Sequence, residues 1–194
     1  MGMKKYFAIF VLLWAACPAT AGDRHACTYL QHKGQDMVTE NNCLTFPKHG
    51  LENTAGGDAL VSKKAAADAS YDENGLAYLF SPAGVFYFTR SGLARKTLIF
   101  DNGPDDFSNG LARTERNGKI GFFDKKLSIV IKPQYDFAYS FENDLALICM
   151  GCIRKKEGEH SRIVGGKWGA INSKGEIIQQ IVHSEAELRA LLKP

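Results

Sequence analysis

The sequence predicts a mostly β fold, built from about three repeated antiparallel β-meander modules with a small disulfide-stapled N-terminal piece and a short C-terminal helix. Two observations predict the repeats. Asn117-Gly118 joins two short strand-like runs, and this dipeptide accepts the positive φ angles of a two-residue hairpin turn. A Leu-Ala pair also recurs after 35 and then 34 residues, and a fixed period in this range is typical of repeat architectures.

The central module occupies residues 107–141. Its first two strands are expected at 111–116 and 119–124, on either side of the Asn-Gly turn. A third strand is expected at 128–132, where three β-branched residues follow one another. Pro133 is expected to end that strand because it cannot donate to a ladder.

The repeat is visible at two matched positions. In the first two copies, Phe86 and Gly121 stand ten residues after the Leu of the Leu-Ala pair. In the third copy the matching residue is Gly169, displaced by an insertion at about 150–164. The residues expected to hold the repeats together are Leu76, Ala77, Leu111, Ala112, Asn117, Gly118, Gly121, Leu145, Ala146, Trp168 and Gly169.

Three short motifs resemble the WG (KWG) repeat family of bacterial proteins. They are the run from Gly166 to Gly169, the run from Pro133 to Asp136, and the Phe-x-x-Gly-Leu-Ala signature that begins at Phe107. The resemblance covers about residues 60–181 and implies a β-repeat architecture with little indication of chemistry. The first copy lacks the glycine and is expected to be a capping repeat, since terminal repeats are usually atypical.

Burial can be predicted at several repeat positions. Leu111, at the head of a first strand, is expected to point inward, so Leu111→Ala should be costly. Arg113 and Thr114 are expected to contribute much less. The indole of Trp168 is expected in the core, with a neighbouring group lying close over Gly169. The alternatives are exposure on the outer face of the third module or a place on a ligand-binding face.

Residues 1–21 have the pattern of an export signal, with a basic start, an apolar stretch of about 12 residues and small residues before a cleavage site between Ala21 and Gly22. A lipoprotein signal at Cys17 is the alternative, disfavoured by Trp14 at the position where that signal prefers a Leu-like residue. The stretch is too short to span a bilayer. The sequence therefore predicts a periplasmic or secreted protein that is not an integral membrane protein.

Charge gives no indication of a polyanionic partner. The full chain carries a net charge of +3. Removing Lys4 and Lys5 with the signal leaves 22 basic and 21 acidic residues. No nucleic-acid partner is therefore expected.

Four cysteines remain after the signal, and an even count in an exported chain indicates two disulfides. Proximity in sequence favours Cys27 with Cys43, inside an N-terminal piece at 22–56, and Cys149 with Cys152, although three pairings are possible. The second pair also has the spacing of redox and metal sites. A redox site needs a following helix that lowers the thiol pKa, whereas a charged loop follows here.

The remaining segments complete the expected organisation. Residues 57–183 form the repeat domain, in which 59–69 include one or two helical turns. Residues 184–194 form a C-terminal segment, whose helix at about 185–192 begins with a capping box of Ser184 and Glu187.

No catalytic, cofactor or metal constellation is evident. The acidic run 101–106 lacks the spacing of a calcium loop and is explained as a turn. The expected function is therefore non-catalytic binding of a protein or cell-envelope partner, with inhibition of an envelope-acting enzyme as one form of it. The alternative is a small thiol-disulfide oxidoreductase that uses Cys149 and Cys152. The insertion at 150–164 is a candidate contact site.

Overall fold

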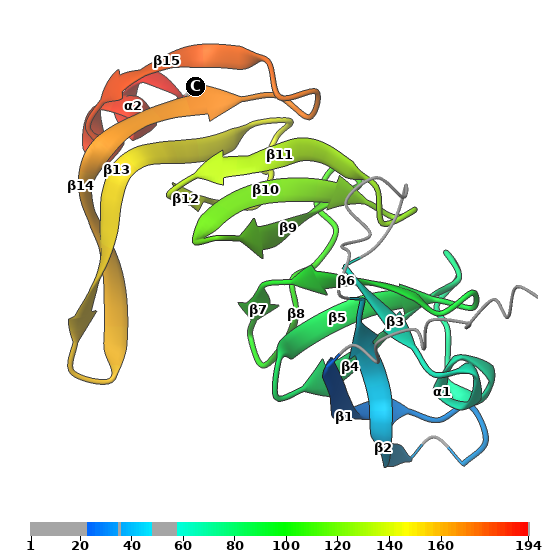
Figure 1. Ribbon diagram of the computed structural model, residues 1–194. Coiled ribbons are helices and arrows are strands. Elements are labelled where there is room, and N and C mark those ends of the chain that lie inside the picture. Colours follow the sequence, from blue (N-terminus) through cyan, green and yellow to red (C-terminus); the bar gives the residue numbers. More distant parts are fainter. Residues whose placement is uncertain (1–22, 35, 48–57, 194) are drawn as a thin grey trace, which may run out of the picture.

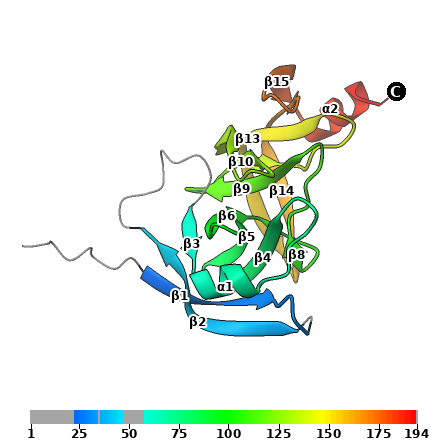
Figure 2. The ribbon, with the colours of Figure 1, turned by 90° about the vertical axis from the view of Figure 1, so that its right-hand side faces the viewer.

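The structure is a computed structural model that describes residues 23–34, 36–47 and 58–193 (Figure 1). The expected signal, its cleavage site at Ala21 and Gly22, and Cys17 lie outside the described residues. The described chain forms a stack of antiparallel sheets, with a barrel at one end and a four-stranded sheet with the C-terminal helix at the other (Figures 1 and 2). The mostly β prediction is thus confirmed.

The barrel is closed by six strands in the order β1-β2-β3-β6-β5-β4. Helix α1 (Lys63–Asp68) follows β3 and is capped by Ser62, whose side chain accepts from the amide of Ala65 at 3.0 Å. The boundary expected between residues 56 and 57 lies outside the described residues. In the described part, β1 of the N-terminal hairpin pairs with β4 of the first repeat. The strands are β1 (Asp23–Leu30), β2 (Met37–Phe46), β3 (Ala59–Val61), β4 (Leu76–Ser81), β5 (Gly84–Thr89) and β6 (Leu93–Thr97).

The barrel core joins the N-terminal hairpin to the first repeat. Tyr29 and Leu44 from the hairpin pack in one cluster with Phe86 and Phe88 from β5. Burying such side chains removes apolar surface from water, at roughly 25 cal/mol per Å². The expected Cys27–Cys43 disulfide is present, and both cysteines belong to this core.

The middle module contains β9 (Leu111–Arg116), β10 (Lys119–Asp124) and β11 (Ile129–Tyr135). Asn117 and Gly118 have φ angles of 53° and 73°, which confirms the hairpin turn. The strand that Pro133 was expected to end instead continues to Tyr135. The β10–β11 register shifts around Pro133, so this residue sits in a bulge where its missing N–H is tolerated. A small hairpin of β7 (Ile99–Phe100) and β8 (Gly103–Pro104) precedes the module.

The C-terminal module has the sheet order β12-β13-β14-β15 and ends in helix α2. Ser184 and Glu187 form the predicted capping box. Leu188 of this helix is buried, whereas Leu191 is exposed, so the helix covers the sheet through only part of its apolar surface. The elements are β12 (Phe137–Ala138), β13 (Ala146–Glu157), β14 (His160–Ile171), β15 (Ile177–His183) and α2 (Glu185–Leu191).

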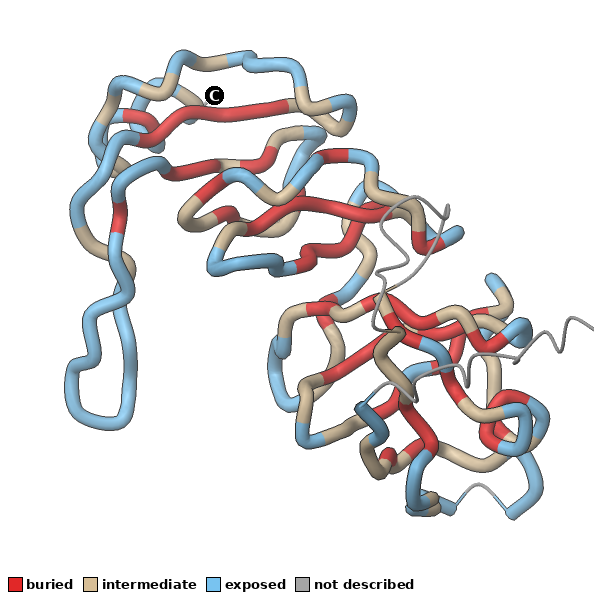
Figure 3. Tube along the Cα trace, viewed as in Figure 1, coloured by how far each residue is buried: buried red, intermediate tan, exposed pale blue. Residues whose placement is uncertain are grey.

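Buried residues follow the second strand of each copy, β5, β10 and β14 (Figure 3). Leu111 is buried as predicted, while Leu145 is only half-buried. That Arg113 and Thr114 contribute much less to stability than Leu111 stays a prediction, but their burial was not expected. Both are buried, with 7 % and 2 % of their surface exposed, because β9 packs against the barrel and encloses them.

Candidate functional site

The repeat glycines are explained by bulges in the third strands. A Cβ on Gly121 would lie 2.4 Å from the carbonyl oxygen of Ile131, and one on Gly169 would lie 2.6 Å from that of Gln179. Such distances exclude any side chain. Each glycine faces a third strand whose register shifts beside it. The repeat motif therefore requires a glycine where the backbone of the third strand passes close to the second strand.

The Leu-Ala pairs lie at the heads of the first strands and are structural. Their alanines are buried in all three copies, and Ala77 belongs to the core of the barrel itself. Leu76 and Ala112 belong to the cluster between the barrel and the middle module, and Ala146 belongs to the cluster between the middle and C-terminal modules. The pair members are Leu76, Ala77, Leu111, Ala112, Leu145 and Ala146.

Trp168 is buried, with 2 % of its surface exposed, as predicted. Its ring stacks on Tyr139 at a centroid distance of 5.8 Å and meets the edge of Phe137 at 6.0 Å. The indole N–H donates to the carbonyl oxygen of Gly165 at 3.2 Å, as a buried indole usually requires. Leu188 of α2 packs in the same cluster. Trp168 therefore anchors the base of the long β13–β14 hairpin.

Cys149 and Cys152 also lie at this base, where they are paired with each other. Both are buried, and both belong to strand β13. A thioredoxin-like pair would instead stand at a helix N-terminus, where the thiolate is stabilised. The arrangement is thus suited to bracing the hairpin.

Both strands of the hairpin turn sharply at the level of this pair. Gly151 and Gly166 stand opposite each other with φ angles of 76° and 70°, a conformation that glycine adopts without strain. A Cβ on Gly166 would lie 2.5 Å from the amide nitrogen of Cys152. The two glycines therefore set the direction in which the hairpin leaves the sheet.

An ion pair between Lys119 and Asp136 also stabilises the base of the hairpin, near Gly151. Asp136 accepts a hydrogen bond from the Gly151 amide at 2.7 Å and one from the Lys119 ammonium at 2.5 Å. The hydrogen bond from Lys119, followed by that from Gly151, lowers the pKa of Asp136. The carboxylate is thus charged at neutral pH and fixes the turn in β13.

Beyond this base the hairpin continues as an arm, defined here as residues 152–164. It projects away from the sheets by about 20 Å, given roughly 3.4 Å per residue (Figure 1). All of residues 153–162 are exposed. The insertion that was expected at 150–164 as a candidate contact site thus forms most of this ribbon.

The arm carries an unusual pairing of charges. Lys155 stands directly opposite Arg162 in the ladder, on the face that also bears Ile153, because alternate residues share a face. Like charges at directly opposite positions destabilise a strand pair. Glu157 lies 3.7 Å from Arg162, whereas Lys155 has no ion-pair partner among the described residues.

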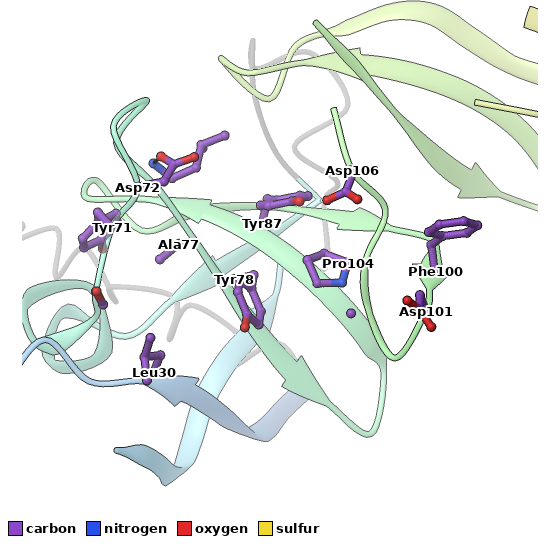
Figure 4. Close-up of a pocket in the computed structure, with 13 residues that line it drawn as sticks. Leu30, Tyr71, Asp72, Ala77, Tyr78, Tyr87, Phe100, Asp101, Pro104 and Asp106 are labelled. Carbon is purple, nitrogen blue, oxygen red and sulfur yellow. Dashed lines mark hydrogen bonds between the residues drawn. The ribbon is translucent and has the colours of Figure 1, made fainter. Parts of the chain in front are cut away.

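A groove of about 550 Å³ lies on the barrel, between β4–β5 and the β7–β8 hairpin. Figure 4 shows Tyr78, Tyr87 and Pro104 near its middle, with Asp106 close to Tyr87 and Asp101 beside Phe100. Among the described residues, no Lys, Arg or His lines it. The lining residues are Leu30, Ser70, Tyr71, Asp72, Leu76, Ala77, Tyr78, Tyr87, Phe100, Asp101, Gly103, Pro104 and Asp106.

The groove is acidic. Burial, together with the carboxylates of Asp106, Asp105 and Asp72, raises the pKa of Tyr87, so this phenol stays neutral. Its hydroxyl donates to the carbonyl oxygen of Asp105 at 3.2 Å. Sequence reasoning missed the groove because it treated 101–106 only as a turn. The combination of that acidic turn with nearby aromatic residues was the available signal.

Searches for other kinds of site gave two findings. Within the described ranges, no group of three or more His, Cys, Asp or Glu side chains is arranged to hold a metal ion. The helices described here include none that is long and apolar enough to cross a membrane.

Comparison with known proteins gave one match. Residues 120–151 match the family model described as WG containing repeat. This segment begins at Ile120, the residue before Gly121, and ends at Gly151, where the arm begins. No curated protein and no solved structure matches the chain. Residues 120–151 therefore contain a WG-type repeat, and Gly169 faces a bulged third strand in the same way as Gly121.

Proposed function

We propose that this protein is an exported, non-catalytic binding protein of the cell envelope, periplasmic or secreted, which contacts a partner protein through its arm. The observation that carries this proposal is the construction of the arm. Residues 153–162 of the arm are all exposed, while its base is braced by Cys149–Cys152, Trp168 and Asp136.

Physical reasons favour a contact role for such an element. An isolated two-stranded hairpin is marginally stable in water, so a fixed base reduces the ordering cost of binding. The exposed Ile153, with 65 % of its surface in water, offers an apolar anchor between charged neighbours. Insertion of the arm into a cleft of an envelope-acting enzyme would make the protein an inhibitor.

The test removes the outer part of the arm and keeps Ile163, which packs against the buried cluster at its base. Arg154 and Ile163 are directly opposite each other, so residues 155–162 can be replaced by Asn-Gly, which closes a two-residue hairpin. We expect the shortened protein to melt within a few degrees of the wild type and to lose its partner in co-purification from envelope fractions. Retention of the partner by the folded, shortened protein would contradict the proposal.

The alternative function is a thiol-disulfide oxidoreductase, and the pairing of Cys149 with Cys152 across two residues is the observation that favours it. Burial of both cysteines argues for a bracing role instead. Reduction of a disulfide-containing peptide by the wild type separates the two. Activity that is abolished by Cys152→Ser in a folded variant would establish the enzyme.

A further inference from the structure

We propose that the arm of one copy of this chain binds in the groove of a second copy, giving a reciprocal dimer held by ion pairs. The inference rests on the proposed function, since it uses the arm as the contact element. It adds a specific partner, a second copy, and a specific receiving site, the groove on the barrel.

The arm lacks a counter-charge. Lys155 and Arg162 are held side by side on one face of an exposed ribbon, with a single carboxylate, Glu157, 3.7 Å from Arg162. Their mutual repulsion weakens the ladder when the chain is alone. An anionic surface on a partner removes this cost, and it also fixes which face of the arm is in contact.

The groove has the complementary charge. Asp101 and Asp106 are exposed, and neither makes an ion pair within the described part of the chain. Phe100 and Tyr78, which also line the groove, keep 57 % and 36 % of their surface exposed. Lys and Arg bury their alkyl stems along such rings, and their charged heads are attracted to aromatic faces.

The two elements do not meet within one chain. Figure 1 shows the tip of the arm set apart from the barrel, on the side where β7 and β8 lie. A second copy related by a two-fold axis therefore offers each arm a groove and each groove an arm, the self-complementary arrangement of most protein dimers. Ile153 shares the charged face of the arm and would lie against Phe100.

Sedimentation equilibrium of the wild type tests the dimer. We expect dimers at about 50 mM salt that dissociate at about 0.5 M, where the Debye length falls below roughly 5 Å. Lys155→Glu with Arg162→Glu should weaken association at least about tenfold. The matched control is Lys156→Glu, on the opposite face of the same strand, which should leave the dissociation constant within about twofold of the wild type.

The groove is tested from its own side. Asp101→Asn with Asp106→Lys should abolish the wild-type dimer, with Asp101→Asn alone as a milder variant that keeps a residue tolerant of positive φ. Glu73→Lys, outside the groove lining, is the control. Mixing this double variant with the arm double variant should restore a heterodimer, because each arm then meets a groove of opposite charge.

Three outcomes would overturn the dimer: a wild type that stays monomeric at about 100 µM and low salt, an arm reversal without effect, or a groove reversal without effect. Failure of the proposed function is a separate result. The groove variants keep an intact arm, so if they are monomeric and still capture the envelope partner, both proposals stand. Capture by folded chains without the outer part of the arm would contradict the proposed function alone.

Discussion

The two junctions between successive modules are built from opposite kinds of side chain. The junction between the barrel and the middle module contains every buried polar or charged residue of the described chain: Arg95, Thr97, Asp105, Arg113 and Thr114. The junction between the middle and C-terminal modules is apolar, with Ile131 and Tyr135 of β11 packed in one cluster with Ala138 and Ile148.

The polar junction is fully hydrogen-bonded. Asp105 accepts the Arg113 amide at 2.8 Å and also its guanidinium. Arg113 also reaches past this junction, because its NH1 donates to the carbonyl oxygen of Ala138 in the C-terminal module at 3.1 Å. Thr97 and Thr114 each donate to a backbone carbonyl across the junction. No described buried side-chain N or O atom lacks a partner. Directional bonds therefore fix how the barrel sits on the array.

The strands at the two junctions differ in their freedom to bulge. β6 pairs with β5 on one side and β3 on the other, so its register against β5 is regular and Phe86 fits opposite it. β11 and β15 are edge strands of their sheets, where bulges are tolerated. Edge position explains why Gly121 and Gly169 are required and why the first copy needs no glycine.

The third strands also show why the C-terminal module differs from the middle one. Relative to β14, Gln179 and His183 of β15 occupy the places that Ile131 and Tyr135 occupy relative to β10. Polar side chains replace apolar ones at the surface that, in the middle module, packs on the next module. Polar residues on the outer face are typical of a terminal repeat, although Ile177, Ile178 and Val182 of β15 are also exposed.

The largest expected effect comes from breaking the polar junction. Asp105→Ala leaves the Arg113 guanidinium buried without its counter-charge, and loss of one member of such a pair costs about 3–5 kcal/mol. Asp106→Ala, at the exposed neighbouring position, should change the free energy of unfolding by less than about 0.5 kcal/mol. Equal denaturant midpoints for the two variants would show that the polar junction does not stabilise the fold.

Truncation at the apolar junction should come next. Ile131→Ala is expected to cost about 2–5 kcal/mol, through lost burial and a cavity. Its counterpart in the C-terminal module, Gln179→Ala, should cost less than about 1 kcal/mol, since nothing packs on it in the same way. Denaturation of both variants measures the contrast. A Gln179→Ala cost as large as that of Ile131→Ala would show that Gln179 also makes stabilising contacts.

Adding one methyl group tests the bulge. Gly121→Ala must push back the β11 backbone and should cost about 1–3 kcal/mol. Gly118→Ala introduces only the strain of positive φ, because nothing lies within 4 Å of its Cβ position, and should cost about 1 kcal/mol. If thermal denaturation ranks Gly118→Ala as the more damaging change, the close crossing is not what selects glycine.

The smallest effect concerns Asp136, which pairs with Lys119 beside the apolar junction. The hydrogen bonds from Lys119 and Gly151 lower the pKa of Asp136, so its stabilisation is complete above the usual Asp value of about 4. That stabilisation is lost as the pH falls through the lower folded pKa. Unfolding free energies between about pH 5 and pH 2 should fall less steeply for Asp136→Asn. Identical slopes would exclude this contribution.

The sequence by itself determined the features that depend on neighbours along the chain. The Asn117-Gly118 turn, the capping box at Ser184 and Glu187, and the Cys27–Cys43 link all follow from conformational preference or short spacing. The repeat period determined the meander modules, because the same sequence pattern predicts the same succession of strands in each copy. The candidate arm was visible as an insertion that interrupts this period.

Tertiary structure decided what depends on neighbours in space. Alternation along a strand says which residues share a face, but not what covers it, so the burial of Arg113 and Thr114 could not be seen. The barrel closes because β1 pairs with β4 at one edge of the first repeat, while β3 bridges β2 and β6 at the other edge. Loop-closure entropy rises only slowly with loop length, so such pairings between separated segments are possible. The continuation of β11 past Pro133 also depends on tertiary structure. As an edge strand, β11 has no partner on its outer side that would need the missing N–H of Pro133.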